Sequence, residues 1–318
     1  MRSDAPNELA ALLKEVRRVT VLSDRLVTGA LAGNYSSVFR GAGIEFDEVR
    51  EYAEGDDPRS IDWGVSARVG RPFVKKYVDE RELTVVFVLD LSPSMEAGFG
   101  PLSVRGMAAR VAACLALSAV RNHDRVGLIA FGDAVERFVP PSTGRAHALR
   151  VVRDCLALPA SAPSSNALSS GGSGLARAVE FAARVLRRRA IVFVLSDFLT
   201  EGWRDALRRC ARRHDVVAVR LAPPELTVDG LEALAPLRLA RVRDPEGGGE
   251  VVVDLGHAPA RAELAARIAR FRERTEEELR RIHVDRVDVV LPRRAGRDAV
   301  ARPLLGLFRM RELRGAKR

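Results

Sequence analysis

The amino-acid sequence predicts an α/β protein with a doubly wound, mainly parallel sheet and a small N-terminal appendage of helix and short strands. From Leu83 onward, strand-length apolar runs alternate with amphipathic helical segments, which is typical of this class. The runs VVFVL and AIVFVL are apolar without a break, as expected of strands covered by helices on both faces. Both runs end in polar residues, and ligands of open α/β sheets bind beyond the carboxyl ends of the strands.

The appendage covers residues 1–82. Apolar residues on one face predict a helix within residues 1–33, and Gly33-Asn34 ends that pattern. The following segment is polar, punctuated by glycine and rich in charges of both signs. We expect short strands near residues 44–52 and 72–79, with a turn at GDDPRS between them.

The main domain covers residues 83–292, and its elements are expected in a regular order. They are a strand at 83–89, a helix at 103–121, a strand at 125–131 joined by a Gly-Asp turn to the strand AVERFVP, helices at 145–157 and 175–188, a strand at 190–195, a helix at 203–213, a strand at 216–221, a hairpin over 237–254, a helix at 259–281 and a strand at 284–291. A basic tail, residues 293–318, follows.

Composition narrows the function classes. The longest apolar runs reach only strand length, so we expect no transmembrane segment, since a membrane helix needs roughly 20 apolar residues. The N-terminus has no uninterrupted apolar stretch of the kind found in signal peptides. Three widely spaced cysteines suggest reduced thiols rather than disulfides, and with these observations they favour a cytoplasmic protein.

The formal net charge of +10 raises the possibility of nucleic-acid binding. From Ala258 onward there are 17 Lys and Arg against 9 Asp and Glu, so most of the excess is C-terminal. Only 4 of the 52 basic residues are lysine, and the tail has few aromatic residues for base stacking. We therefore expect a solvated or protein-facing tail and no nucleic-acid partner, with a nucleic-acid binder acting through the tail as an alternative.

Polar side chains gather where two predicted strands end. Asp90, Ser92 and Ser94 occupy alternate positions after the first strand, and Asp197 follows the strand IVFVLS. Ser173 lies in a Ser/Gly-rich loop before a helix, from which its hydroxyl can reach the same crevice. Two carboxylates and three hydroxyls suit Mg²⁺ or Mn²⁺, and the absence of His and Cys from the set argues against zinc. A structural role is the alternative, since Asp and Ser also cap helices.

The same residues resemble the metal-ion-dependent adhesion site (MIDAS) of von Willebrand factor A domains, in which D-x-S-x-S is joined by a hydroxyl from a second loop and a later Asp. The upstream segment from FRGAGIEFDEVREYAEGDDPRSIDW to KKYVDERELTV resembles the bacterial family called domain of unknown function 58. The late segments RRHDVVAV and DPEGGGEVVVD fit the same family. The resemblance implies that the metal ligands are Asp90, Ser92, Ser94, Ser173 and Asp197. The second loop of such sites commonly offers Thr where this chain has Ser173.

The resemblance further implies a protein-binding module in which a partner supplies an acidic side chain to the metal. It implies an association with AAA-type ATPases of the MoxR group, as an adaptor in maturing or remodelling other proteins. Many relatives carry membrane helices, which this sequence lacks.

We expect no catalytic activity. The chain contains no Gly-Lys pair and therefore no P-loop, and only hydroxyls accompany Asp90 where a nucleophilic carboxylate would need an acid–base partner. A metal-dependent hydrolase using Asp90 remains the enzymatic alternative.

The charged segment 45–82 has two interpretations. Its charged residues are expected to form a network around Trp63 that attaches the appendage to the main domain. The alternative is a docking face for an ATPase. The residues expected in the network are Arg59, Asp62, Arg68, Glu80 and Arg81.

Overall fold

The computed structural model describes residues 45–53, 56–78, 82–98, 103–161, 173–243, 249–291 and 298–315, together with Arg17. The chain forms two compact units. Residues 39–82 are one, and the larger unit is described from Leu83 onward. Apart from Arg17, the helix expected within residues 1–33 lies outside the described residues.

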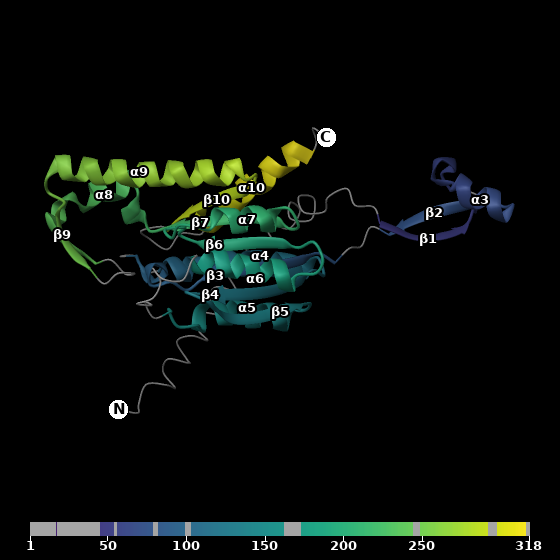
Figure 1. Cartoon of the computed structure of the whole chain (residues 1–318), viewed down its shortest axis with the longest axis horizontal. Helices are drawn as coiled ribbons and strands as arrows, with labels where there is room; N and C mark the ends of the chain where they lie inside the picture. The colour runs from purple at the N-terminus through teal and green to yellow at the C-terminus, as the bar shows by residue number, and fades with distance from the viewer. Residues whose placement is uncertain are drawn as a thin grey trace, which may run out of the picture. The chain divides into compact units, whose positions relative to one another are not determined.

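A six-stranded sheet forms the centre of the larger unit (Figure 1). Its strands lie in the order β10-β7-β6-β3-β4-β5, and every neighbouring pair is parallel except β4 and β5. This arrangement confirms the predicted doubly wound, mainly parallel sheet. The strands are β3 (Thr84–Asp90), β4 (Arg125–Phe131), β5 (Val135–Ser142), β6 (Ile191–Ser196), β7 (Asp215–Ala222) and β10 (Asp285–Val290).

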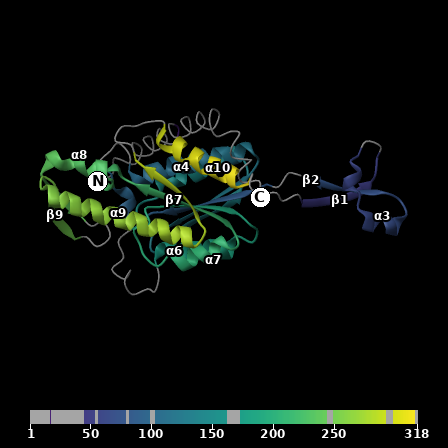
Figure 2. The ribbon, with the colours of Figure 1, turned by 90° about the horizontal axis from the view of Figure 1, so that it is seen from above.

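Helices cover both faces of this sheet. Figure 2 shows α4 and α10 on one side and α6, α7 and α9 on the other. The helices are α4 (Val104–Arg121), α5 (Arg145–Ala157), α6 (Gly174–Val185), α7 (Arg204–Ala211), α9 (Ala258–Arg281) and α10 (Asp298–Gly315). The chain turns in opposite directions from β3, towards β4 and towards β6, so these strands mark the point where the winding reverses.

Alternation along the strands divides the core into two layers. Val86 and Val88 of β3 pack with Val192 and Val194 of β6 against apolar residues of α6 and α7. The odd-numbered residues point to the opposite face, because side chains alternate along a strand. On that face the rings of Phe87 and Phe193 stack with centroids 6.0 Å apart. Asp90 and Ser196 therefore continue the layer beneath α6 and α7.

The C-terminal segment, expected to be a solvated or protein-facing tail, forms a helix with a buried apolar face. Residues 298–315 form α10, and its buried side chains are Val300, Ala301, Leu304, Leu307 and Phe308. Pro303 and Gly306 lie inside this helix, and both residues lower helix propensity. The spacing of the buried residues is nevertheless helical, so packing outweighs propensity here.

Two further helices were not expected from the sequence. They are α8 (Val228–Leu234), after the short 3₁₀ helix η4 (Pro224–Leu226), and α3 (Trp63–Val69) of the smaller unit. Both are seven residues long, too short for a clear periodic pattern. The expected hairpin in the C-terminal half is present as β8 (Leu239–Arg243) and β9 (Glu250–Asp254), which pair antiparallel.

The smaller unit contains an antiparallel pair, β1 (Glu45–Glu51) and β2 (Phe73–Val78), close to the ranges expected. Asp62 caps α3 by accepting hydrogen bonds from Gly64 N (2.9 Å) and Val65 N (3.3 Å). The Trp63 side chain is 70% exposed. The expected charged network stays a prediction, because two of its five members, Glu80 and Arg81, lie outside the described residues.

Candidate metal-binding site

The candidate site lies where two neighbouring strands end. β3 and β6 are parallel, with Leu89 opposite Leu195, so their carboxyl ends reach the same edge of the sheet. Asp90 is the last residue of β3, Ser196 is the last of β6, and Asp197 follows directly. The two aspartates expected at the site therefore come together at the reversal of the sheet winding, where open α/β proteins bind ligands.

The loop after β3 folds back over Asp90. Ser92 N donates to Asp90 Oδ1 over 2.9 Å, and the chain then enters the 3₁₀ helix η3 (Pro93–Glu96). This turn brings the Ser92 and Ser94 hydroxyls to 3.0 Å from each other. The Ser94 hydroxyl also hydrogen-bonds to the Asp197 carboxylate. The D-x-S-x-S spacing thus gathers its oxygens as predicted, through a tight turn rather than a continuing strand.

The end of β6 is held by Ser196, which the sequence analysis did not select. Its Oγ donates to Asp90 Oδ2 (2.6 Å) and accepts from Phe198 N (3.0 Å), so it joins the two strand ends. The signal was present in the sequence, because Ser196 is the polar residue immediately before Asp197 and ends an apolar strand.

An unusual backbone turn after Asp197 orients its side chain. Phe198 has φ of 60°, in the left-handed region that bulky residues rarely adopt. Its ring is buried and meets Trp203 edge-on, with centroids 5.4 Å apart, while Leu199 N donates to Asp197 Oδ1 over 3.1 Å. Such conformations persist only where surrounding contacts enforce them, and they cluster at functional sites.

Burial dominates the electrostatics of the two carboxylates. Asp90 is 2% and Asp197 is 9% exposed. Burial, followed by the nearby charge of Asp197, raises the pKa of Asp90 from its ordinary 3.8 to about 7. Burial also raises the pKa of Asp197, against the hydrogen bond from Ser94. The site therefore holds two carboxyl groups that resist ionising together.

Ser173 occupies a different position from the other candidates. It is the N-cap of α6, and its Oγ accepts a hydrogen bond from Ala176 N over 3.2 Å. Within the described part of the chain, no hydrogen bond joins Ser173 to either aspartate. Its backbone N is 3.9 Å from the position that a Cβ would take on Gly202, in the loop after β6. Ser173 thus borders the same edge, and its direct participation stays a prediction.

A row of polar residues extends from the site across the sheet. Ser196 pairs in register with Arg220 of β7, and Arg220 pairs with Asp288 of β10. Since paired residues of parallel strands point to one face, all three continue the layer that contains Asp90. Arg220 is buried, and its Nε donates to Asp288 Oδ1 over 2.7 Å. An arginine inside the otherwise apolar run VVAVRL was the sequence signal for this row.

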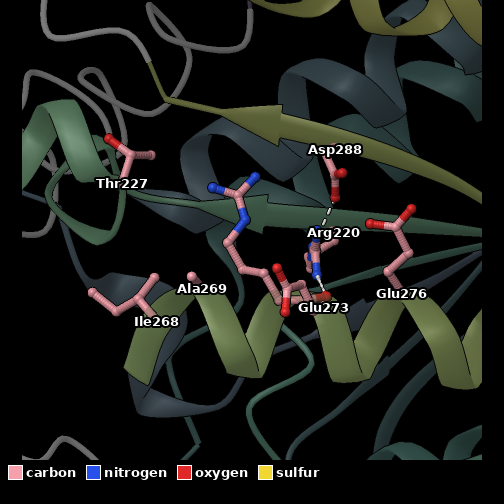
Figure 3. A pocket seen from close by; sticks show the side chains of 8 residues that line it. Arg220, Thr227, Ile268, Ala269, Glu273, Glu276 and Asp288 are labelled. Atoms are coloured by element: carbon pink, nitrogen blue, oxygen red, sulfur yellow. Dashed lines mark hydrogen bonds and ion pairs between the residues drawn. The ribbon is translucent and has the colours of Figure 1, made fainter. Parts of the chain in front are cut away.

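A pocket of about 290 Å³ lies at the far end of that row, between α9 and the strands β7 and β10 (Figure 3). Arg220 crosses its base and donates from Nη1 to the Arg272 carbonyl of α9 over 2.9 Å. Arg286 of β10 pairs with both Glu276 (2.6 Å) and Asp288 (3.1 Å). The arginines and carboxylates named here form ion pairs with one another, so the row attaches α9 to the sheet near the candidate site.

The oxygen-rich donor set suits a hard divalent cation. Mg²⁺ prefers oxygen ligands in octahedral geometry and keeps several waters, so two carboxylates with hydroxyls can hold it. Over the described ranges, no group of three His, Cys, Asp or Glu side chains is placed to bind a metal.

Comparison with known proteins gives the family. Residues 48–274 match the family described as "Protein of unknown function DUF58". The chain belongs to this family. It is 35% identical over 223 residues to the uncharacterized protein Rv1480 of Mycobacterium tuberculosis strain H37Rv and, to the same extent, to the uncharacterized protein Mb1516 of Mycobacterium bovis. The match covers 70% of this chain and 67% of each relative.

The chain is also similar to two solved structures. The conserved hypothetical protein BatB from Bacteroides thetaiotaomicron shares 18% identity, with a TM-score of 0.39, over 71% of this chain and 99% of BatB. The SpRpn10 VWA domain shares 15% identity, with a TM-score of 0.32, over 45% of this chain and 76% of that domain. Among the described helices, none is long and apolar enough to cross a membrane.

Proposed function

We propose that this protein is a non-enzymatic adaptor that binds a protein partner through a divalent cation, Mg²⁺ or Mn²⁺. The ligands from this chain are Asp90, Ser92 and Ser94, with Asp197 acting directly or through a water. Ser173 is the candidate hydroxyl from the second loop, since a hydroxyl has two lone pairs and can cap a helix and bind a cation together.

One observation carries this proposal, namely that two buried carboxylates, Asp90 and Asp197, meet with serine hydroxyls at one edge of the sheet. Burial, followed by the nearby charge of Asp197, raises the pKa of Asp90 to about 7. Burying two like charges is unfavourable unless a positive charge compensates them. Hydrogen bonds from Ser196 and Ser92 favour the charged form of Asp90. A bound dication would provide the missing charge in a site that already presents its oxygens.

The partner's contribution depends on the open coordination positions of the cation. Two carboxylates and neutral hydroxyls leave a dication with positions for water, and where Asp197 acts through a water the cation keeps part of its positive field, which attracts a further anion. Asp90 and Ser94 are buried, whereas Ser92 and Ser173 are partly exposed. An incoming Glu or Asp would approach on the exposed side and replace one water.

The resemblance to von Willebrand factor A domains and the DUF58 family motivates the identity of the partner. We propose a MoxR-type AAA ATPase or its client, in protein maturation or remodelling. In this role the protein requires no catalytic activity of its own. Purified protein should therefore release no phosphate from ATP, and turnover that disappears in Asp90→Asn would favour the hydrolase alternative.

Calorimetric titration tests the cation site directly. Mg²⁺ and Mn²⁺ should give binding heats with the wild type and none with Asp90→Ala. Asp205→Ala is the matched control, because Asp205 is an exposed aspartate on α7 whose ion pair in the described structure is with Arg208 (3.2 Å). Equal heats for the wild type and Asp90→Ala would contradict the site.

Capture of the ATPase tests the bridge between the two proteins. Binding should require both the cation and Asp90, so EDTA and Asp90→Ala should each abolish it while Asp205→Ala should not. Capture that survives both treatments would rule out the cation bridge. It would instead favour binding through the charged segment 45–82 or the basic C-terminal segment.

A further inference from the structure

The β8–β9 hairpin is a second surface with features of a binding site. Its two strands pair only with each other in the described structure, with Leu239 opposite Asp254 and Val242 opposite Val251. Each strand therefore has one open edge, at which backbone N–H and C=O groups can pair with another chain.

The hairpin also exposes large apolar side chains. Leu239 is 67%, Val242 is 49%, and Val251 and Val252 are each 63% exposed. An isolated two-stranded hairpin is marginally stable in water, and it gains stability when a third strand covers it. By the strand register, Leu239 and Val252 lie on one face of the hairpin and Val242 and Val251 on the other, and exposed apolar side chains of this size commonly mark an interaction site.

The hydrogen bonding identifies which groups of β9 point outward. Leu255 N donates to Arg238 O, at the position next to the Leu239–Asp254 pair. Hydrogen-bonded and non-hydrogen-bonded pairs alternate in an antiparallel ladder. The Val253 and Val251 backbones thus pair with β8, whereas the N–H and C=O groups of Glu250, Val252 and Asp254 face the open edge.

Those same three residues set the chemistry of the edge. Their side chains share one face, because alternate residues of a strand point to the same side. A strand added along β9 would therefore meet an acidic, an apolar and an acidic side chain in succession. The Asp254 side chain is held in place, since its Oδ1 accepts from Gly256 N (2.9 Å) and His257 N (3.2 Å). Glu250 lies 3.6 Å from Arg241 and remains 45% exposed.

We propose that β9 binds an extended segment of another protein by adding it as a third strand. The segment would carry basic, apolar and basic side chains at alternate positions, facing Glu250, Val252 and Asp254. Opposite charges across neighbouring strands stabilise the pair, and like charges destabilise it. The site is separate from the cation site and does not depend on it.

Charge argues against a symmetric pair of copies of this chain at either edge. Two β9 strands paired about a two-fold axis at Val252 would place Glu250 opposite Asp254 of the second copy. Two β8 strands paired about Arg241 would bring two arginines together. Both symmetric arrangements oppose like charges.

Cyclic hairpin peptides provide the probe, because cyclisation reduces the cost of ordering a strand on binding. One carries the outer strand Lys-Thr-Val-Thr-Lys and the other Glu-Thr-Val-Thr-Glu. In NMR titrations of the full chain up to roughly millimolar peptide, the Lys peptide should shift the amides of β9 and bind about tenfold more tightly. Since the chain carries a net charge of +10, general attraction would favour the Glu peptide, so this preference reports the local edge.

Three comparisons complete the test. N-methylation of the central valine of the Lys peptide should abolish binding, because it removes the backbone N–H that would donate to β9. Val252→Lys should also abolish it, while Leu313→Lys, at a site 62% exposed on α10, should leave it unchanged. Absence of shifts, equal binding of the two peptides, or self-association that Val252→Lys abolishes would each overturn the proposal.

Discussion

Asp90 and Asp197 illustrate how a strand end can hold reactive groups at a cost in stability. Both carboxyl groups are buried, and hydrogen bonds from Ser92, Ser94 and Ser196 only partly replace the water that they lose. A proton on Asp90 or a cation between the two groups would relieve the repulsion. Protons and cations should therefore compete for this site.

Asp90→Asn should separate the stabilising effects of pH and metal. Because the folded-state pKa of Asp90 is raised to about 7, the folded chain binds a proton more tightly than the unfolded chain. The stability from this group is therefore full below the unfolded value of 3.8 and is lost as the pH rises through about 7. Without metal, Asp90→Asn should raise the unfolding free energy by roughly 1–3 kcal/mol at about pH 8 and much less at about pH 5. Urea denaturation in EDTA measures both values.

Added Mg²⁺ should act in the opposite direction, by stabilising the wild type relative to the variant. Mg²⁺ should stabilise the wild type at about pH 8 and should have no effect on Asp90→Asn, which lacks the anionic ligand. An equal gain from Asp90→Asn at both pH values would show that the ionisation of buried Asp90 is not its cause.

Ser196→Ala should weaken the site without removing a proposed ligand. The hydroxyl holds Asp90 Oδ2 and the Phe198 N–H, so its loss leaves two buried groups with fewer partners. We expect the unfolding free energy to fall by about 1–3 kcal/mol and Mg²⁺ affinity to fall with it. Ser118→Ala is the matched control, since Ser118 is equally buried but bonds only its own helix at Cys114 O (2.8 Å). Unchanged Mg²⁺ affinity in Ser196→Ala would contradict a positioning role.

The residues at the site differ in how far the sequence could predict them. Asp90 and Asp197 were predictable because strand order places them at one edge. Ser92 and Ser94 were predictable as members of the D-x-S-x-S motif, although a tight turn and not strand alternation brings their hydroxyls together. Ser196 was not selected, since a strand's last residue can point to either face until its register is known. The left-handed turn at Phe198 depends on its contact with Trp203, which no local pattern encodes.

At the level of elements, α10 shows how ion pairs attach a helix to the sheet. Arg311 contacts both oxygens of Asp215, each at 2.8 Å, and Asp285 Oδ2 at 2.7 Å. Arg314 adds a contact with Asp285 Oδ1 at 2.7 Å. These aspartates begin β7 and β10, at the amino ends of the strands and opposite to the candidate metal site. The basic residues of this helix thus serve partly as anchors.

Arg311→Ala should loosen α10. The side chain is 11% exposed, so its removal leaves two carboxylates without their main counter-charge. Asp215 and Asp285 are half-buried and Asp285 keeps its contact with Arg314, so we expect a loss of about 1–3 kcal/mol in unfolding free energy and faster amide exchange in α10. Arg309→Ala, at an exposed position of the same helix, should change stability by less than about 0.5 kcal/mol. Similar losses in the two variants would contradict the anchoring role.

Elements were predictable where the pattern was long. The strands β3 and β6 and the helices α4 and α9 follow from extended apolar runs or periodic segments. α3 and α8 are too short to show a period, and α10 contains Pro303 and Gly306, which obscure the helical spacing of its apolar residues. In α10, tertiary packing decides a structure that local propensity disfavours.

The whole molecule carries a charge that neither proposal requires. The net charge is +10, and the part of the excess on α10 is reduced where Arg311 and Arg314 pair with Asp215 and Asp285. A diffuse positive charge of this kind supports weak, non-specific attraction to polyanions, whereas a specific nucleic-acid site concentrates donors on one face. Non-specific attraction and a specific site therefore differ in how the affinity depends on salt and in whether it depends on individual residues.

Binding to a short DNA duplex should therefore be weak and independent of the cation site. Because such binding comes from the release of counterions, the affinity should fall steeply between about 50 and about 200 mM salt. Fluorescence anisotropy with a labelled duplex measures it, and Asp90→Ala with or without Mg²⁺ should give the same curve as the wild type. Arg309→Ala, which removes one exposed charge of α10, should reduce the affinity only slightly. Tight binding at the higher salt concentration that is lost in Arg309→Ala would instead favour a nucleic-acid binder acting through the C-terminal helix.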